Sequence, residues 1–501
     1  MSASTSSSIL DLSVVELAQL IRQKKLSPVE VTTAHIERIQ EINPYINALV
    51  AERFDLALQE AHSAERKLQH DEIDVAKQAL FGVPCTVKEF WAVRGLPQTG
   101  GMVHRKECIS EDDAEIIKRV RAAGAIVLGG TNVPEGGMWA ESDNRLYGRT
   151  NNPWDLSRTS GGSSGGDGAI VGAGGAPFAI SSDIGGSIRL PAAFCGACGH
   201  KPTGNLVPNQ GHFPPAPEQI SNYLTGGPIA RRCQDLLAVL RVIADSQHNV
   251  ALPLSSDELP KSDELKVFFA TDNGRYRVSE CVQQAVMQSV NALREQGAQI
   301  QELDEPRLKK SFEIWTSMIG EAQDGSYGEL LAEGQELEIL REVFKIMVGR
   351  SDHTPHAIGM AALDRVFRKL PERFAPIKQL ATEGRSLKQD LETLLGERGI
   401  LIYPAYSRTA PPHNFTVLNP LDIAYTAIFN VLEFPSTVLP ICRDEDGLPI
   451  AVQVIGPRGA DRLCLHVAEL LERQFGGWKR AEPTRAPRRD SMIERLRAAR
   501  K

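Results

Sequence analysis

The residues best suited to chemistry lie in one stretch, residues 160–190, which is rich in glycine and serine. Glycine at this density suits backbone that takes a positive φ or passes close to another group. A flexible Gly/Ser linker lacks large apolar residues, whereas this stretch contains Ile170, Val171 and Phe178. The composition therefore favours a folded site built partly from backbone amides.

Ser163 is a first candidate nucleophile. Residues 161–165 fit the pattern G-x-S-x-G, which is typical of the nucleophile turn of α/β-hydrolases. Such a site also needs a histidine base. No local pattern distinguishes any of the candidate histidines, which are His104, His200, His212 and His413. An esterase that uses Ser163 and a histidine is therefore kept as an alternative.

Lys88 is a candidate base, because it interrupts the apolar stretch of residues 79–93. Lysine is almost never fully buried unless it is paired or functional. At its ordinary pKa of about 10.4, roughly 1 lysine in 2500 is neutral at pH 7, and burial increases that fraction. Lys88 therefore either reaches solvent from an edge strand or serves as a buried base, and this segment alone leaves both interpretations open.

Cys195 and Cys198 have the spacing of a zinc or redox motif. A structural zinc site needs four ligands and the sequence has no second pair of this spacing, so two buried free thiols are favoured and no metal is predicted. The eight cysteines are scattered along the chain, which is typical of reduced thiols in a cytoplasmic protein. No phosphate-binding glycine motif is complete.

The overall composition bounds the class of protein. A 501-residue chain with 42% hydrophobic and 24% charged residues can bury a sizeable core. The formal charge of −7 argues against a general nucleic-acid binder. Residues 1–9 do not resemble a signal peptide, and no apolar run of about 18 residues predicts a membrane span. A small neutral or amphiphilic partner fits best.

Helix signals recur along the chain. Capping boxes begin helices at Ser13 and Ser27, and Asn43-Pro44 is expected to end the second. Apolar periodicity predicts further helices over residues 51–68, 113–123, 235–245, 278–296 and 463–474. Residues 307–397 are expected to be largely helical. Their apolar positions are expected to pack in the core rather than line a substrate channel, and include Trp315, Met318, Phe344 and Met347.

Strand signals occur early and return late. They are predicted within residues 79–91 and over 125–130, 265–271, 298–302, 400–406, 436–441 and 450–456, with Asp446-Gly447 as a hairpin turn. Because the late strands must rejoin the early ones, the predicted fold class is α/β, a single α/β/α domain with a central mixed sheet. Its expected extent is residues 9–478, with core motifs in 80–230, a variable helical substrate region in 250–400 and returning strands in 400–456. Residues 479–501 are a basic tail.

Three motifs together resemble the amidase signature family: Lys88, residues 161–166 (GGSSGG) and residues 182–189 (SDIGGSIR). The resemblance continues through residues 191–204 and is closest to the fatty-acid amide hydrolase branch. It implies the amidase signature fold and a Ser-cisSer-Lys triad. In that triad Ser187 is the nucleophile, Ser163 the bridging serine after a cis peptide bond, and Lys88 the base, with no cofactor.

The resemblance also implies supporting residues. Backbone N–H groups of Ile184, Gly185, Gly186 and Ser187 would stabilise an oxyanion. Met138 and Trp139 fall where the branch lines its acyl pocket, and Ser164 and Ser182 fall at hydrogen-bonding positions. Asp183 and Arg189 either pair to hold the oxyanion loop or form an ordinary surface ion pair. Glu89 stands where many members have Asp, and no effect on mechanism is expected.

The predicted function is an amidase that hydrolyses the C–N bond of a small-molecule carboxamide, with an apolar acyl or aryl group, to an acid and ammonia or an amine. One alternative is an amidotransferase-type subunit that acts on Gln or Asn with partner subunits, and the Ser163 esterase is another. A catalytically dead scaffold is disfavoured, because all three triad positions are present. A homodimer is left open.

Overall fold

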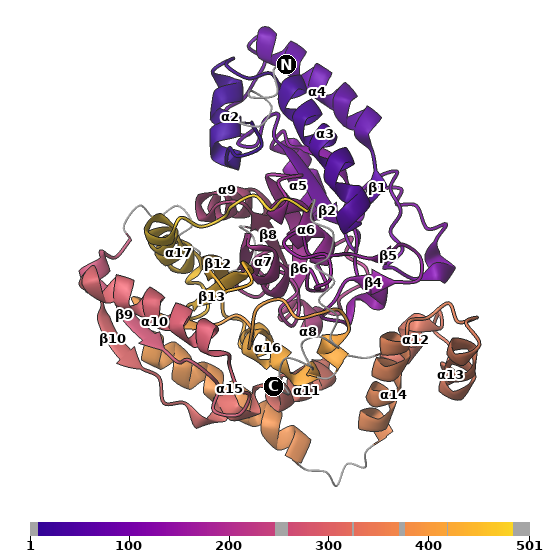
Figure 1. Ribbon diagram of the computed structural model, residues 1–501, viewed down its shortest axis with the longest axis vertical. Coiled ribbons are helices and arrows are strands. Elements are labelled where there is room, and N and C mark those ends of the chain that lie inside the picture. The colour runs from indigo at the N-terminus through magenta and orange to yellow at the C-terminus, as the bar shows by residue number, and fades with distance from the viewer. Residues whose placement is uncertain (1–8, 246–258, 323–324, 370–375, 418, 484–501) are drawn as a thin grey trace, which may run out of the picture.

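The core of the computed structural model is an eleven-stranded mixed sheet in the order β1-β3-β2-β6-β8-β7-β12-β13-β11-β9-β10 (Figure 1). The structure describes residues 9–245, 259–322, 325–369, 376–417 and 419–483. The strands are β1 (Leu49–Glu52), β2 (Pro84–Lys88), β3 (Ile126–Thr131), β6 (Phe178–Asp183), β7 (Cys198–Lys201), β8 (Thr225–Ala230), β9 (Lys266–Phe269), β10 (Gln299–Glu302), β11 (Gly399–Pro404), β12 (Ser436–Arg443) and β13 (Pro449–Ile455). A separate ribbon pairs β4 (Asp143–Asn144) with β5 (Gly148–Arg149).

Helices cover this sheet (Figure 1). They are α2 (Val14–Arg22), α3 (Pro28–Ile46), α4 (Phe54–Gln69), α5 (Glu115–Ala122), α6 (Gly165–Gly172), α7 (Arg189–Cys195), α8 (Glu218–Ser221), α9 (Cys233–Ile243), α10 (Glu280–Glu295), α11 (Ser311–Ala322), α12 (Tyr327–Leu331), α13 (Ile339–Met347), α14 (Pro355–Lys369), α15 (Pro376–Leu395), α16 (Ala424–Val431) and α17 (Asp461–Phe475). The predicted α/β fold with a helix-covered mixed sheet is confirmed.

Two apolar cores lie on opposite faces of the sheet, because successive side chains of a strand point to opposite sides. In β3, Val127 belongs to the core under α5, α9 and α17, whereas Ile126 and Leu128 belong to the core under α6 and α7. Both faces of the central strands are therefore buried. Burial on both faces explains why the sequence of these strands is continuously apolar instead of alternating.

The late strands rejoin the early ones, as the sequence predicts. β7 pairs antiparallel with β12, which forms the predicted hairpin with β13. β2 and β6 run parallel, and each carries a residue of the site at its carboxyl end. Because carboxyl ends of neighbouring parallel strands meet at one edge of a sheet, Lys88 and Asp183 are brought together there.

Several local predictions differ from the structure. The capping boxes at Ser13 and Ser27 are present, but α3 continues through Pro44 to Ile46. Proline is tolerated there because only the last turn loses a hydrogen bond, and Asn47 ends the helix in a left-handed conformation. The sequence does not predict strands β1, β6, β7 and β8. Glycine or serine interrupts the strand pattern of β6, β7 and β8, whereas β1 overlaps the start of the helix predicted over residues 51–68.

The expectation that Phe344 and Met347 pack in the core is wrong. They lie on α13 and are 61% and 72% exposed. In Figure 1, α12, α13 and α14 form a group beside the sheet, where a small apolar cluster includes Tyr327 and Leu331. Trp315 and Met318 are buried in α11. Trp315 also lines a cavity, so the expectation of core packing is confirmed for Met318 and only in part for Trp315. The basic tail beyond residue 483 lies outside the described residues.

The central strand β6 provides a test of the fold. Phe178→Ala should lower the free energy of unfolding by about 3–5 kcal/mol, because it leaves a cavity where a fully buried aromatic ring packs in the core. Phe344→Ala is the matched control, since it makes the same change at an exposed position. Denaturant unfolding followed by circular dichroism compares them, and an equal loss in both variants would contradict the assigned core.

Candidate active site

Lys88 is the last residue of β2 and is 1% exposed. Its Nζ donates to Ser163 Oγ at 2.7 Å and to the carbonyl of Ser182 at 3.2 Å. Burial lowers its pKa to about 7, and the carboxylates of Asp167 and Asp183 limit the fall. The edge-strand alternative is therefore wrong, and an amine that is partly neutral near pH 7 lies against a serine hydroxyl.

Ser163 lies in the loop before α6 and follows a cis peptide bond from Gly162, as expected. The loop is tightly enclosed, because a Cβ at Gly162 would collide with the backbone of residues 139–141. Ser142 braces it from the side: its hydroxyl donates to the carbonyls of Gly161 and Ser163, each at 3.3 Å, and accepts the N–H of Gly165 at 2.9 Å.

Ser187 lies in the loop between β6 and α7 and is 9% exposed. The two serine loops are joined directly, because the N–H of Ser164 donates to the carbonyl of Ser187 at 3.2 Å. Both serine side chains, Ser163 and Ser187, line one cavity of about 140 Å³. The hydrogen bonds of the described residues do not include one between these two hydroxyls.

Asp183 and Arg189 form a buried ion pair that holds the loop carrying Ser187. Both side chains are 0% exposed, and two guanidinium nitrogens of Arg189 each lie 3.0 Å from a different carboxylate oxygen of Asp183. The same carboxylate accepts the N–H groups of Gly186 and Ile188 at 2.7 and 3.0 Å. The Arg189 charge and these hydrogen bonds hold the pKa of Asp183 well below its usual range, although burial opposes them. The alternative of a surface ion pair is wrong.

The N–H of Gly186 is therefore occupied by Asp183, which differs from its predicted role as an oxyanion donor. Among the hydrogen bonds of the described residues, none uses the N–H of Ile184, Gly185 or Ser187. Gly186 has a φ of +127°, and a Cβ there would collide with the Thr426 hydroxyl. Thr426 also donates to the carbonyl of Gly185 at 2.8 Å, so the loop is fixed in this conformation.

Ser164 and Ser182 form hydrogen bonds beside Lys88. Ser164 Oγ donates to the Ser182 carbonyl at 3.3 Å, the same carbonyl that accepts from Lys88. Ser182 Oγ donates to Nε2 of His212 at 2.9 Å, whose Nδ1 lies 2.9 Å from the carbonyl of Pro214. Burial lowers the pKa of His212 to about 3, so this histidine is neutral.

Comparisons with known proteins agree with this arrangement. Residues 30–465 match the family described as Amidase. The chain is 39% identical to fatty-acid amide hydrolase 2-A of Danio rerio, over 94% of this chain and 90% of that protein. It is 37% identical to fatty-acid amide hydrolase 2 of Homo sapiens, with the same coverage. The solved structure of a fatty acid amide hydrolase superposes with a TM-score of 0.75 at 25% identity, covering 94% of this chain and 86% of that one.

The chain belongs to the amidase family. It is a hydrolase that acts on amide C–N bonds. No helix in the described part of the chain is long and apolar enough to cross a membrane.

Sequence reasoning missed Asp167, a buried acid of this amidase. It lies in the first turn of α6 and is 0% exposed. Its two carboxylate oxygens accept the hydroxyls of Thr131 and Ser181, each at 2.6 Å. Burial raises the pKa of Asp167, whereas these two hydrogen bonds and the charge of Lys88 oppose the rise. A sequence signal does exist, because Asp167 is the one charged residue in a helix that otherwise contains small and apolar residues.

Residues distant in the sequence also contact the candidate site. Asn430 of α16 donates to a carboxylate oxygen of Asp183 at 2.9 Å, and Gln453 of β13 lies 3.4 Å from Arg189. Trp315 of α11 donates its indole N–H to the carbonyl of Ile184 at 2.9 Å. No local sequence pattern marks these contacts. They exist only because the late strands and helices pack against the early ones.

The cavity beside the serines is mainly apolar. Its lining includes Met138, Ile184, Ile220, Leu224, Trp315 and Ile319. The only histidine in its lining is His212, and no Lys, Arg, Asp or Glu lines it among the described residues. Trp139, in contrast to its neighbour Met138, does not line this cavity and stacks on His356 with ring centroids 5.0 Å apart. The cavity fits a neutral group.

The buried ion pair gives a prediction for stability. Asp183→Asn leaves the Arg189 charge uncompensated in the interior, so it should destabilise the amidase by about 3–5 kcal/mol. The difference in free energy of unfolding between the wild-type protein and this variant should be full above about pH 4 and shrink below it. The reason is that the pKa of Asp183 is lower in the folded state than in the unfolded state, so acid protonates the unfolded chain first.

Asp446→Asn is the control, since it breaks the pair with Arg158 in which Asp446 is 53% exposed. The loss of stability in Asp446→Asn should stay within about 1 kcal/mol. Denaturant unfolding of the three proteins between pH 3 and pH 7 measures both effects, and a similar cost for the two variants would contradict the assignment.

Proposed function

We propose that the protein is a serine amidase that uses Ser187, Ser163 and Lys88 in a proton relay. Ser187 Oγ attacks the amide carbon and forms a C–O bond while its proton passes to Ser163, whose own proton passes to neutral Lys88. The relay then runs in reverse, so that the leaving nitrogen takes a proton as the C–N bond breaks. Water hydrolyses the resulting acyl ester on Ser187 and releases the acid.

The single observation that carries this proposal is the 2.7 Å hydrogen bond from the buried amine of Lys88 to Ser163 Oγ. A hydroxyl is a poor base, but a hydroxyl in contact with a neutral amine can take one proton and give up another. Hydrogen bonds between catalytic groups are often completed only when substrate binds. We therefore expect substrate to bring Ser187 Oγ within reach of Ser163.

Backbone amides are proposed to stabilise the oxyanion that forms during attack. The N–H groups of Ile184, Gly185 and Ser187 remain available, whereas that of Gly186 orients the loop through Asp183. Fixed donors of this kind each contribute about 10² to 10³ in rate. The ion pair of Asp183 with Arg189 keeps them in place before substrate arrives.

The proposed substrate is a carboxamide with an apolar acyl or aryl group. The cavity is lined by aliphatic and aromatic side chains and by a neutral histidine. Free Gln or Asn would bring a charged ammonium and carboxylate into this lining without partners, which is costly. This argument weighs against an amidotransferase-type subunit.

The esterase alternative has less support, because the described histidines do not reach Ser163. Both ring nitrogens of His212 are occupied by Ser182 and Pro214. His200 contacts Thr437 and Asp461, and His413 contacts Leu156. The base in contact with Ser163 is Lys88.

We further propose a cytoplasmic location, supported by eight cysteines that are all free thiols. The homodimer stays a prediction.

Asp167 is proposed as the group that tunes Lys88. Its carboxylate stabilises the protonated amine and so keeps the pKa of Lys88 from falling further. The relay needs neutral Lys88, so amidase activity should rise as the pH rises through about 7. Asp167 thereby sets the position of this rise.

A fluorophosphonate probe tests the nucleophile. The probe should form one adduct, and peptide mapping by mass spectrometry should locate it on Ser187. Ser187→Ala should abolish labelling. Lys88→Ala should lower kcat/KM on an apolar amide by about 10² to 10⁴ because the base is lost. Ser289→Ala is the control, since Ser289 is a buried serine of α10 far along the chain. An adduct on Ser163 would support the esterase instead.

The pH profile tests the role of Asp167. Asp167→Asn removes a negative charge that favours protonated Lys88, so the acidic limb of the kcat/KM profile should move to lower pH. Asp461→Asn is the matched control, because Asp461 is also buried and bonded to a hydroxyl but does not influence Lys88. An unmoved limb in Asp167→Asn, or an equal shift in both variants, would refute the proposed tuning.

A further inference from the structure

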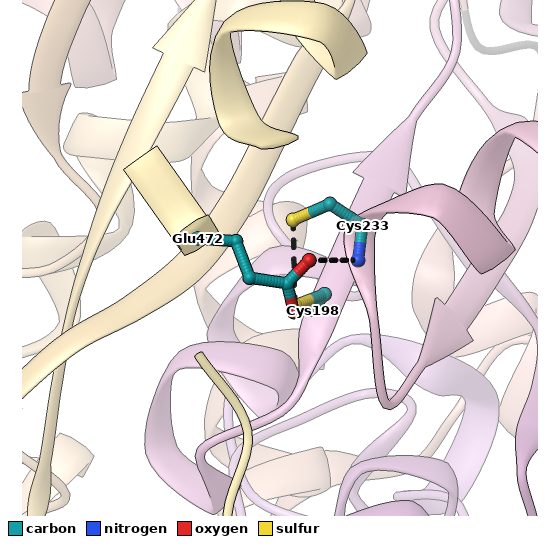
Figure 2. Close-up of side chains that lie close together, drawn as sticks. All are labelled: Cys198, Cys233 and Glu472. Carbon is teal, nitrogen blue, oxygen red and sulfur yellow. Dashed lines mark hydrogen bonds between the residues drawn. The ribbon is translucent and has the colours of Figure 1, made fainter. Parts of the chain in front are cut away.

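Two thiols and one carboxylate form a cluster where β7, α9 and α17 meet (Figure 2). Cys198 is the first residue of β7, Cys233 the first of α9, and Glu472 lies in α17. The two sulfur atoms are 3.6 Å apart, and Cys198 Sγ lies 3.9 Å from a carboxylate oxygen of Glu472. We propose that this cluster is a binding site for a thiophilic divalent cation of the zinc class.

The sulfur separation suits a shared cation. With Zn–S bonds of about 2.3 Å, two sulfurs 3.6 Å apart subtend an angle of roughly 103° at the metal, close to tetrahedral. One ligand atom from each of the three residues lies within 4.8 Å of the other two. Side-chain movements of about 1 Å therefore bring all three to bonding distance, and solvent supplies the fourth ligand.

The carboxylate is already oriented for this role. One oxygen of Glu472 accepts the N–H of Cys233 at 2.9 Å, which leaves the oxygen nearer Cys198 for the cation. A second interaction that fixes a ligand in this way is characteristic of metal sites. Both cysteines are buried, whereas the side chain of Glu472 is 13% exposed, so the cation enters from the Glu472 side.

The charges balance when a divalent cation binds. Two S–H bonds break, two metal–sulfur bonds form, and the two protons leave to solvent, so the added charge of the cation replaces the charge of the protons. The charge of Glu472 is already offset by Arg232, whose guanidinium nitrogen lies 3.9 Å from the carboxylate oxygen nearer Cys198, on the side where the cation would bind. Because thiolate ligands favour zinc-class cations over magnesium and calcium, the site is selective for soft metals.

The pairing differs from the one suggested by the sequence. Cys195, the nearer candidate in sequence, contacts the carbonyl of Ser160 through its sulfur at 3.5 Å. Cys198 instead meets Cys233, which is 35 residues away. The isolated Cys195-Cys198 spacing thus does not define this site, and its third ligand lies in a helix near the end of the described chain.

Cobalt(II) provides the test, because thiolate ligands give it a charge-transfer band in the near ultraviolet and tetrahedral geometry gives it strong visible bands. The full-length protein is reduced, treated with a chelator and titrated with Co²⁺. We expect both sets of bands at one equivalent and their loss when zinc is added. Cys198→Ser and Cys233→Ser should each abolish the charge-transfer band, and Glu472→Gln should weaken affinity roughly tenfold or more.

Cys464→Ser is the control, because Cys464 is a buried thiol outside the cluster and its removal should leave the spectrum unchanged. Circular dichroism confirms that each variant is folded, and mass spectrometry of the native protein counts bound metal independently. Should Cys198→Ser not fold, Cys233→Ser decides the question. Absence of the charge-transfer band in the wild-type protein, or its persistence in Cys233→Ser, would overturn the proposal.

Discussion

Lys88 is held away from water at the end of a strand that has neighbours on both sides. A fall of its pKa from 10.5 to about 7 corresponds to roughly 5 kcal/mol in favour of the neutral amine. The fold can maintain this only if water stays excluded and if no carboxylate forms a direct ion pair with the amine. Lys88 donates instead to a hydroxyl and a carbonyl, both neutral. The proposed relay depends on these two neutral hydrogen-bond partners.

The two buried acids near Lys88 are kept from pairing with it by other groups. Asp183 is neutralised by Arg189, and Asp167 is bound by two hydroxyls. Each acid therefore acts on Lys88 only through its longer-range charge, which moderates the effect of burial without reversing it. Arg189 in turn needs acceptors that come from α16 and β13, so the surroundings of Lys88 rely on chain segments beyond residue 420.

Local signals in the sequence predict much of the fold and point to the residues of the proposed site. Lys88, Ser163 and Ser187 could be named because motifs surround them, and the return of strands after residue 400 followed from apolar runs. The sequence suggests that Asp183 pairs with Arg189, but it does not show that the pair is buried, because burial depends on the complete fold. Thr426 and Asn430 were missed for the same reason, since their contacts cross more than 240 residues. The exposure of α13 was missed because periodicity identifies an apolar face without saying what covers it.

Catalysis and substrate preference have a common physical origin in this arrangement. Burial lowers the pKa of Lys88, and the mainly apolar lining of the neighbouring cavity makes that cavity costly for a charged substrate. A bound anion would do more than incur that cost, because its charge beside the amine would favour the protonated form and so remove the base. A bound cation would lose its hydration without gaining a carboxylate partner among the described residues that line the cavity. An uncharged substrate would leave the buried lysine neutral and the proposed relay intact.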